Sequence, residues 1–178
     1  MVESSQSGNK AVFETFIRGT AEAVWAELTK THEPQAAMFN AIMHAPEQAP
    51  GAPLQMRTKN GKFTSVVGEF LVIEPPRKLS HTLRFTAYDD PHTVVTYEIE
   101  PEAGDEGEGV RFRLTVEGML AGTKTSKSMM QGGPMICTVM KAVVETGKPP
   151  LWYRALGGVF EVLGAFTTPA KCKTENWA

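Results

Sequence analysis

The middle of the chain is a series of short segments rich in β-forming residues, and this feature limits the possible folds more than any other. The segments cover residues 54–59, 64–74, 78–86, 93–100 and 110–118. The last three alternate apolar and polar residues, which gives a strand one face of each kind. Asn60-Gly61 separates the first two segments and is a dipeptide typical of tight hairpins. The pattern therefore predicts an antiparallel sheet.

The segments before this sheet predict one more strand and two short helices. Residues 12–18 are β-branched and aromatic and end at Gly19, as a strand would. Thr20 is suited to cap a helix that carries Val24, Trp25 and Leu28 on one apolar stripe. We expect the second short helix between Pro34 and about Met43.

The segments after the sheet predict two further helices. A long helix is expected from Gly133-Pro134 to Gly147, because proline is favoured at the first helical position and glycine just after the last. A second, amphipathic helix is expected at residues 152–166, although its three glycines weaken it. Residues 101–109, acidic and rich in glycine, are expected to form a solvated hairpin loop.

The order of these elements predicts an α+β fold, in which a curved antiparallel sheet wraps around the long helix and leaves a cavity between them. With 178 residues, of which 42% are hydrophobic, the chain is long enough for one domain with a substantial core. Its net charge of −2 gives no basic surface for nucleic acid. We expect no nucleic-acid partner.

Cysteine content and hydropathy indicate where the protein resides. Two cysteines are too few for a disulfide framework and fit a reducing compartment. Residues 1–10 are polar and lack the apolar core of a secretory signal. No apolar run approaches the ~20 residues of a membrane span. We therefore expect a cytoplasmic protein without stable membrane insertion.

Four segments carry a resemblance to a known superfamily. They are Thr20–Leu28, Gly68–Leu79, Val94–Pro101 and Met140–Lys148. In their order and spacing the chain resembles the START-like (SRPBCC) superfamily, in the AHSA-like branch related to the C-terminal domain of the heat-shock ATPase activator. The resemblance implies a helix-grip fold, as in START and Bet v 1 domains, with a mostly apolar internal pocket. It divides the chain into a polar leader (1–10), a helix-grip domain (11–148) and a C-terminal extension (149–178).

Two positions depart from the pattern of this superfamily. Its members often carry a tryptophan just before the long helix, where this chain has Gly132-Gly133. They also carry an aromatic residue late in the third-strand motif, where this chain has Leu83. Both changes remove bulk that shapes the pocket, so ligand size is not carried over from the resemblance.

The candidate ligand site consists of residues expected on the walls of the cavity. They are His81, Tyr97, Phe39, Phe85, Met135, Val139 and Met140. His81 shares its strand face with three apolar residues, so its imidazole either contacts a ligand or is a core histidine bonded to a backbone carbonyl or to Tyr97. Nine methionines suit an adaptable pocket and an ordinary core equally well.

The sequence predicts no catalytic residue, metal site or cofactor. It contains no H-x-x-x-H or C-x-x-C pattern and no G-x-S-x-G elbow. Our leading hypothesis is therefore binding of a small hydrophobic or amphipathic ligand. The alternatives are a cyclase- or dehydratase-like enzyme with His81 as general base, and a module that interacts with a chaperone. The extension, through residues 152–166, would cover its own sheet, act as a lid or join two copies in a homodimer.

Overall fold

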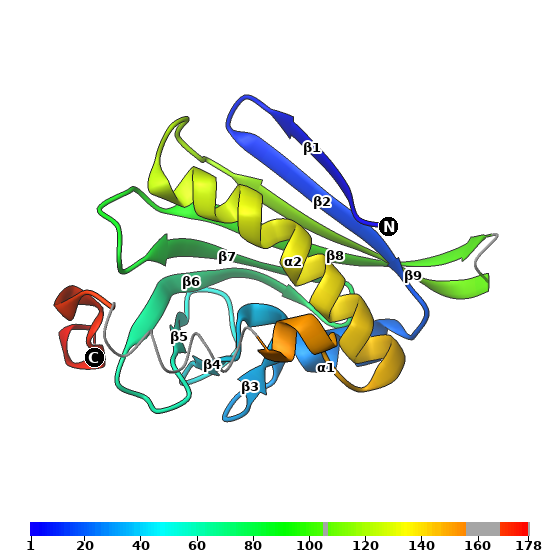
Figure 1. The fold of residues 1–178 in the computed structure, drawn as a ribbon, viewed down its shortest axis with the longest axis horizontal. Coiled ribbons are helices and arrows are strands. Elements are labelled where there is room, and N and C mark those ends of the chain that lie inside the picture. The colour runs from blue at the N-terminus through cyan, green and yellow to red at the C-terminus, as the bar shows by residue number, and fades with distance from the viewer. Residues whose placement is uncertain (105–106, 156–167, 178) are drawn as a thin grey trace.

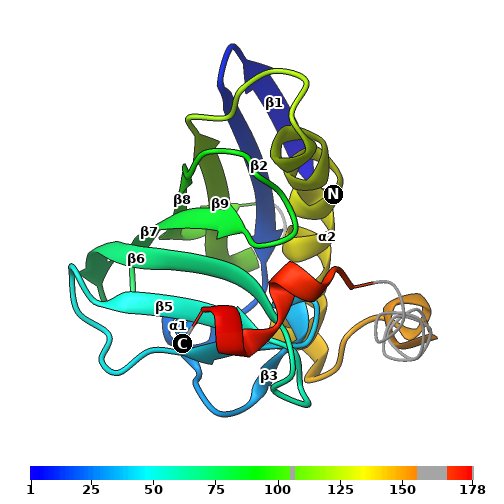
Figure 2. The ribbon, with the colours of Figure 1, turned by 90° about the vertical axis from the view of Figure 1, so that its left-hand side faces the viewer.

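The computed structural model describes residues 1–104, 107–155 and 168–177. In this part of the chain nine strands form one antiparallel sheet in the order β1-β2-β9-β8-β7-β6-β5-β4-β3. The strands are β1 (Glu3–Ser7), β2 (Lys10–Ile17), β3 (Pro34–Gln35), β4 (Ala41–His44), β5 (Pro53–Arg57), β6 (Thr64–Glu74), β7 (Lys78–Phe85), β8 (Thr93–Gly104) and β9 (Gly107–Glu117). The sheet curves around the long helix α2 (Lys124–Thr146), as Figures 1 and 2 show, which confirms the predicted helix-grip fold.

Helix α2 begins ten positions before the predicted start. Thr123 is its N-cap, and the Thr123 hydroxyl accepts a hydrogen bond from Ser126 N at 3.1 Å. Pro134 lies inside the helix instead of at its first position. The C-terminus is as predicted, because Gly147 takes a left-handed conformation and donates from its N–H to Val143 O.

A glycine in α2 sets the close approach of helix and sheet. A Cβ atom built on Gly133 would lie 2.4 Å from the ring of Phe13 on β2. Gly132, its neighbour, would place a Cβ atom no nearer than 3.5 Å to the ring of Phe39. Only Gly133 is therefore required for the packing of α2 against β2.

The helix predicted between Pro34 and Met43 is wrong. The first short helix forms as predicted, as α1 (Ala21–Thr29) with its N-cap at Thr20. The second is only a turn of 3-10 helix, η1 (Ala36–Met38), between the edge strands β3 and β4. Phe39 and Asn40 both have φ near 57°, a left-handed conformation that ends the turn and reverses the chain into β4. Pairing of β4 with β5 then outweighs the weak helical pattern.

Two further strand segments were not predicted. In the segment expected to be a loop at 101–109, residues 101–104 instead continue β8 and residues 107–109 begin β9, with Pro101 paired with Val110 and Ala103 with Glu108. Cross-strand contacts between Arg111 and Glu102 favour this extension. The polar leader contributes β1, which pairs with β2.

The extension returns to the sheet at its end. Residues 151–155 are helical, but most of the helix predicted at 152–166 lies outside the described residues. Residues 168–177 contain the short 3-10 helices η2 (Ala170–Cys172) and η3 (Thr174–Asn176), which lie beside the β5–β6 hairpin (Figure 2). None of the described helices combines the length and apolarity needed to cross a membrane.

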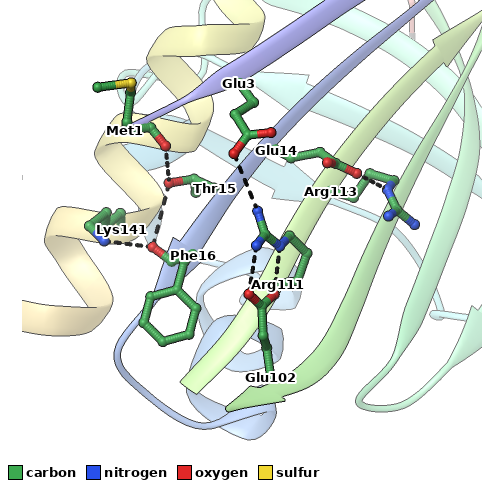
Figure 3. A network of polar contacts seen from close by, with 9 residues as sticks. All are labelled: Met1, Glu3, Glu14, Thr15, Phe16, Glu102, Arg111, Arg113 and Lys141. Atoms are coloured by element: carbon green, nitrogen blue, oxygen red, sulfur yellow. Dashed lines mark hydrogen bonds and ion pairs between the residues drawn. The ribbon is translucent and has the colours of Figure 1, made fainter. Parts of the chain in front are cut away.

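The sheet face away from α2 carries a ladder of ion pairs. Arg113 contacts Glu14 on β2 and Glu98 on β8, and Glu98 also pairs with Lys78 on β7. Arg111 makes two short contacts with Glu102 and a longer one with Glu3 of β1 (Figure 3). The partners of Arg113 and the Lys78–Glu98 pair lie directly opposite each other in the strand register, whereas Arg111 reaches Glu102 and Glu3 diagonally. The ladder therefore supports the pairing of β1, β2, β9, β8 and β7.

Candidate functional site

A cavity of about 930 Å³ lies between the sheet, η1 and the N-terminal half of α2. Most of its wall is apolar, and five of the nine methionines take part in it: Met38, Met43, Met56, Met129 and Met135. Unbranched thioether side chains adapt their shape easily to a bound molecule. The volume lies within the range of roughly 300–1,000 Å³ that is usual for small-molecule sites.

Most residues of the predicted site lie on this wall. The lining residues are His81, Tyr97, Phe39, Phe85 and Met135. Val139 and Met140 are buried in the core and are not among the described residues that line the cavity. The cavity borders only the N-terminal half of α2, whereas the C-terminal half packs close to the start of α1, as the approach of Val144 to Gly19 indicates.

His81 on β7 presents an uncharged acceptor to the cavity. Its Nδ1 lies 2.8 Å from the backbone oxygen of Thr82 and therefore carries the proton, because a carbonyl oxygen only accepts. Burial lowers the pKa of His81, and the bond to Thr82 offsets this only partly. The ring is then neutral, and Nε2 is left as an acceptor that has no hydrogen-bond partner among the described residues.

Tyr97 on β8 lies beside His81 and supplies a donor. The centroids of the two rings are 5.9 Å apart, and Tyr97 also stacks on Phe112 at 6.1 Å. The Tyr97 hydroxyl donates to Met38 Sδ at 3.8 Å, which is a weak interaction. Burial raises the pKa of Tyr97, so the phenol keeps its proton.

Gln35 is a wall residue that the sequence did not identify. Its Nε2 donates to Leu28 O at 3.1 Å and to Lys30 O at 2.8 Å, which fixes the orientation of the amide. Its Oε1 is buried and has no hydrogen-bond partner within the described ranges. The sequence pattern around Gln35 does not indicate a position on the cavity wall, because it predicts a helix for this segment.

The turn between β5 and β6 adds polar residues to the lining of the cavity. Thr58, Lys59 and Asn60 come from the turn between β5 and β6. Lys59 is exposed, and it is the one charged side chain among the described residues that line the cavity. The C-terminal extension contributes Tyr153 and Thr168, and the Tyr153 hydroxyl donates to Ala36 O of η1 at 2.6 Å. The extension is thus part of the cavity wall.

The described residues contain no arrangement typical of nucleophilic catalysis or of a metal centre. Burial raises the pKa of Cys137 to about 12, so its side chain is a neutral thiol. No group of three or more His, Cys, Asp or Glu residues within the described ranges is placed to hold a metal ion. The arrangement is suited to holding an uncharged molecule by apolar contact and a few hydrogen bonds.

A family model described as Activator of Hsp90 ATPase homolog 1-like protein matches residues 10–145. No curated protein matches the chain.

Several solved structures share the fold. CalU16 from Micromonospora echinospora has 14% identity and a TM-score of 0.58, and the match covers 94% of this chain and 99% of that one. The Aha1 dimer from Colwellia psychrerythraea has 13% identity and a TM-score of 0.60, over 78% and 98% of the two chains. Protein MLL2253 from Mesorhizobium loti has 20% identity and a TM-score of 0.58, over 75% and 95%.

Proposed function

We propose that this chain, which belongs to the family of Activator of Hsp90 ATPase homolog 1-like proteins, binds a small hydrophobic or amphipathic molecule in the cavity between the sheet and α2. The observation that carries the proposal is the cavity itself, about 930 Å³ in volume and lined mostly by apolar side chains. A ligand that fills it would remove its own apolar surface from water, which contributes about 25 cal/mol per Å².

Gly132, where members of the superfamily often carry a tryptophan, offers a direct test of this proposal. Gly132 lines the cavity, and its missing side chain leaves space in the wall. The Gly132→Leu variant should fill part of that space. We expect it to weaken binding of the neutral fluorescent probe N-phenyl-1-naphthylamine by at least about tenfold, since a bound molecule and a new side chain cannot share one volume.

Gln131→Leu is the matched control. It adds the same side chain to the adjacent, exposed position of α2, outside the cavity. The proposal predicts probe binding equal to that of the unmodified chain. It fails if the probe does not bind the unmodified chain, or if both variants bind it equally well.

A chaperone partner is the second candidate, and the description of the family favours it. Adding increasing amounts of the purified chain to an Hsp90-type ATPase would test it. This function predicts a change in the rate of ATP hydrolysis that saturates with concentration, and an unchanged rate would count against it.

We also propose a homodimer through residues 152–166. The solved Aha1 from Colwellia psychrerythraea is a dimer, and Trp152 is 46% exposed at the start of the segment. Light scattering should give the mass of a dimer for the full chain and of a monomer for Trp152→Lys. A monomer in both would contradict the proposal.

A further inference from the structure

The deep wall of the cavity combines one acceptor with one donor, and together they specify a chemical group. His81 Nε2 offers a lone pair, because Nδ1–H is used on Thr82 O at 2.8 Å. The Tyr97 hydroxyl offers a proton, for which the thioether of Met38, at 3.8 Å, is the sole acceptor found among the described residues. The two rings are neighbours, with centroids 5.9 Å apart, and both residues line the cavity, so a single ligand group that contacts both polar atoms is the arrangement to test.

The same wall is unsuited to a charged group. Among the described lining residues only Lys59 is charged, and it is exposed in the turn between β5 and β6, whereas His81 and Tyr97 lie on β7 and β8. A carboxylate placed at His81 would face the lone pair of Nε2 and lose its hydration without meeting a cation. Gln35, whose buried Oε1 is a second acceptor without a hydrogen-bond partner in the described residues, also lines the cavity.

We propose that the buried end of the ligand is an uncharged hydroxyl group, of an alcohol or a phenol, which donates a hydrogen bond to His81 Nε2 and accepts one from the Tyr97 hydroxyl. The inference rests on the proposed ligand-binding function and names the class of molecule: a hydroxylated hydrophobe and not a fatty acid. The hydroxyl fits because it is at once a donor and an acceptor.

The test compares ligands that differ only in this group. Dodecanol, dodecyl methyl ether and dodecanoate form one series, and 2-naphthol, 2-methoxynaphthalene and 2-naphthoate form a second series of different shape. Each competes with N-phenyl-1-naphthylamine at pH 7. In at least one series, the hydroxyl compound should bind about tenfold more tightly than the ether and about tenfold more tightly than the carboxylate. Neither the ether nor the carboxylate donates a hydrogen bond to His81 Nε2, and a buried acceptor without a partner costs roughly 1–3 kcal/mol.

Two variants separate the two hydrogen bonds. In His81→Leu the preference for alcohol over ether should fall to nearly onefold, because the acceptor that distinguishes them is gone. In Tyr97→Phe that preference should persist while alcohol and ether both bind several-fold more weakly, since each accepts from Tyr97. Tyr97→Phe keeps the ring that stacks on Phe112. Tyr88→Phe, which removes a hydroxyl bonded to Ser128 Oγ, is the control for loss of a phenol.

The outcomes distinguish this inference from the proposed function. Carboxylates that bind as tightly as the hydroxyl compounds, or an alcohol preference that survives in His81→Leu, would overturn the inference and leave ligand binding intact. If neither the probe nor any of the six compounds binds, both proposals fail.

Discussion

Gly132 and Gly133 are adjacent in the sequence but differ in the space around them. A methyl group on Gly133 would lie 2.4 Å from the ring of Phe13, whereas one on Gly132 would make an ordinary contact of 3.5 Å with Phe39. We expect Gly133→Ala to lower the free energy of unfolding by about 1–3 kcal/mol through overpacking. Gly132→Ala should raise it by up to about 1 kcal/mol, through the gain in helix propensity. Urea denaturation of the two variants measures both, and equal effects would contradict this packing.

His81 should make stability depend on pH. Its folded-state pKa is lowered from the ordinary value of 6.5, mainly by burial, so the unfolded chain binds the proton more tightly. The stability that the neutral ring contributes is complete above about pH 6.5 and is lost progressively as the pH falls below it. Between pH 7.5 and 5 the free energy of unfolding should fall less steeply in His81→Leu than in the unmodified chain. An exposed-site variant, His92→Gln, is the control.

At the level of elements, the turn from η1 to β4 carries backbone strain. Phe39 has φ 57°, which costs a non-glycine residue about 1–2 kcal/mol, and its side chain is half exposed. Phe39→Gly should therefore be more stable than Phe39→Ala by about 1 kcal/mol, the reverse of the order in ordinary secondary structure. Thermal denaturation gives the order directly, and a more stable alanine variant would show that the turn is not strained.

Strands with a clear period of two could be predicted from the sequence, and elements set by long-range contacts could not. β7 and the end of α2 at Gly147 lie where the pattern places them. The start of α2 was missed because Pro134 and two glycines resemble a helix start, whereas the capping threonine precedes a polar first turn. Residues 101–109 have the composition of a loop, and cross-strand partners such as Arg111 favour the strand conformation of residues 101–104 and 107–109.

The residues of the candidate site show the same difference between positions set by a periodic pattern and positions set by long-range contacts. His81 and Tyr97 could be placed on one wall because alternation assigns strand faces. Val139 and Met140 were expected on that wall because helical periodicity gives the face of α2 but not which half of it borders the cavity. Gln35 and Tyr153 reach the cavity through chain reversals that leave no periodic signal.

At the level of the whole molecule, the last residues of the chain hold the β5–β6 hairpin. Trp177 O accepts from Gln55 Nε2 at 2.5 Å, Thr174 N donates to Lys62 O at 3.0 Å, and Cys172 is buried. Removing residues 169–178 should lower the free energy of unfolding by about 2 kcal/mol, from the lost apolar contacts and hydrogen bonds. Chemical denaturation of the shortened chain measures this, and an unchanged midpoint would mean that the segment only rests on the surface.

The two borders of the sheet limit how copies of the protein can meet. At one border lies β1, five exposed residues without an apolar side chain, and at the other lies β3, only two residues long and begun by a proline that has no N–H to offer. Neither presents a long apolar template on which a strand of a second molecule could be added. These two borders therefore disfavour edge-to-edge growth of so wide an open sheet into aggregates, and they favour a dimer built from surfaces other than strand edges.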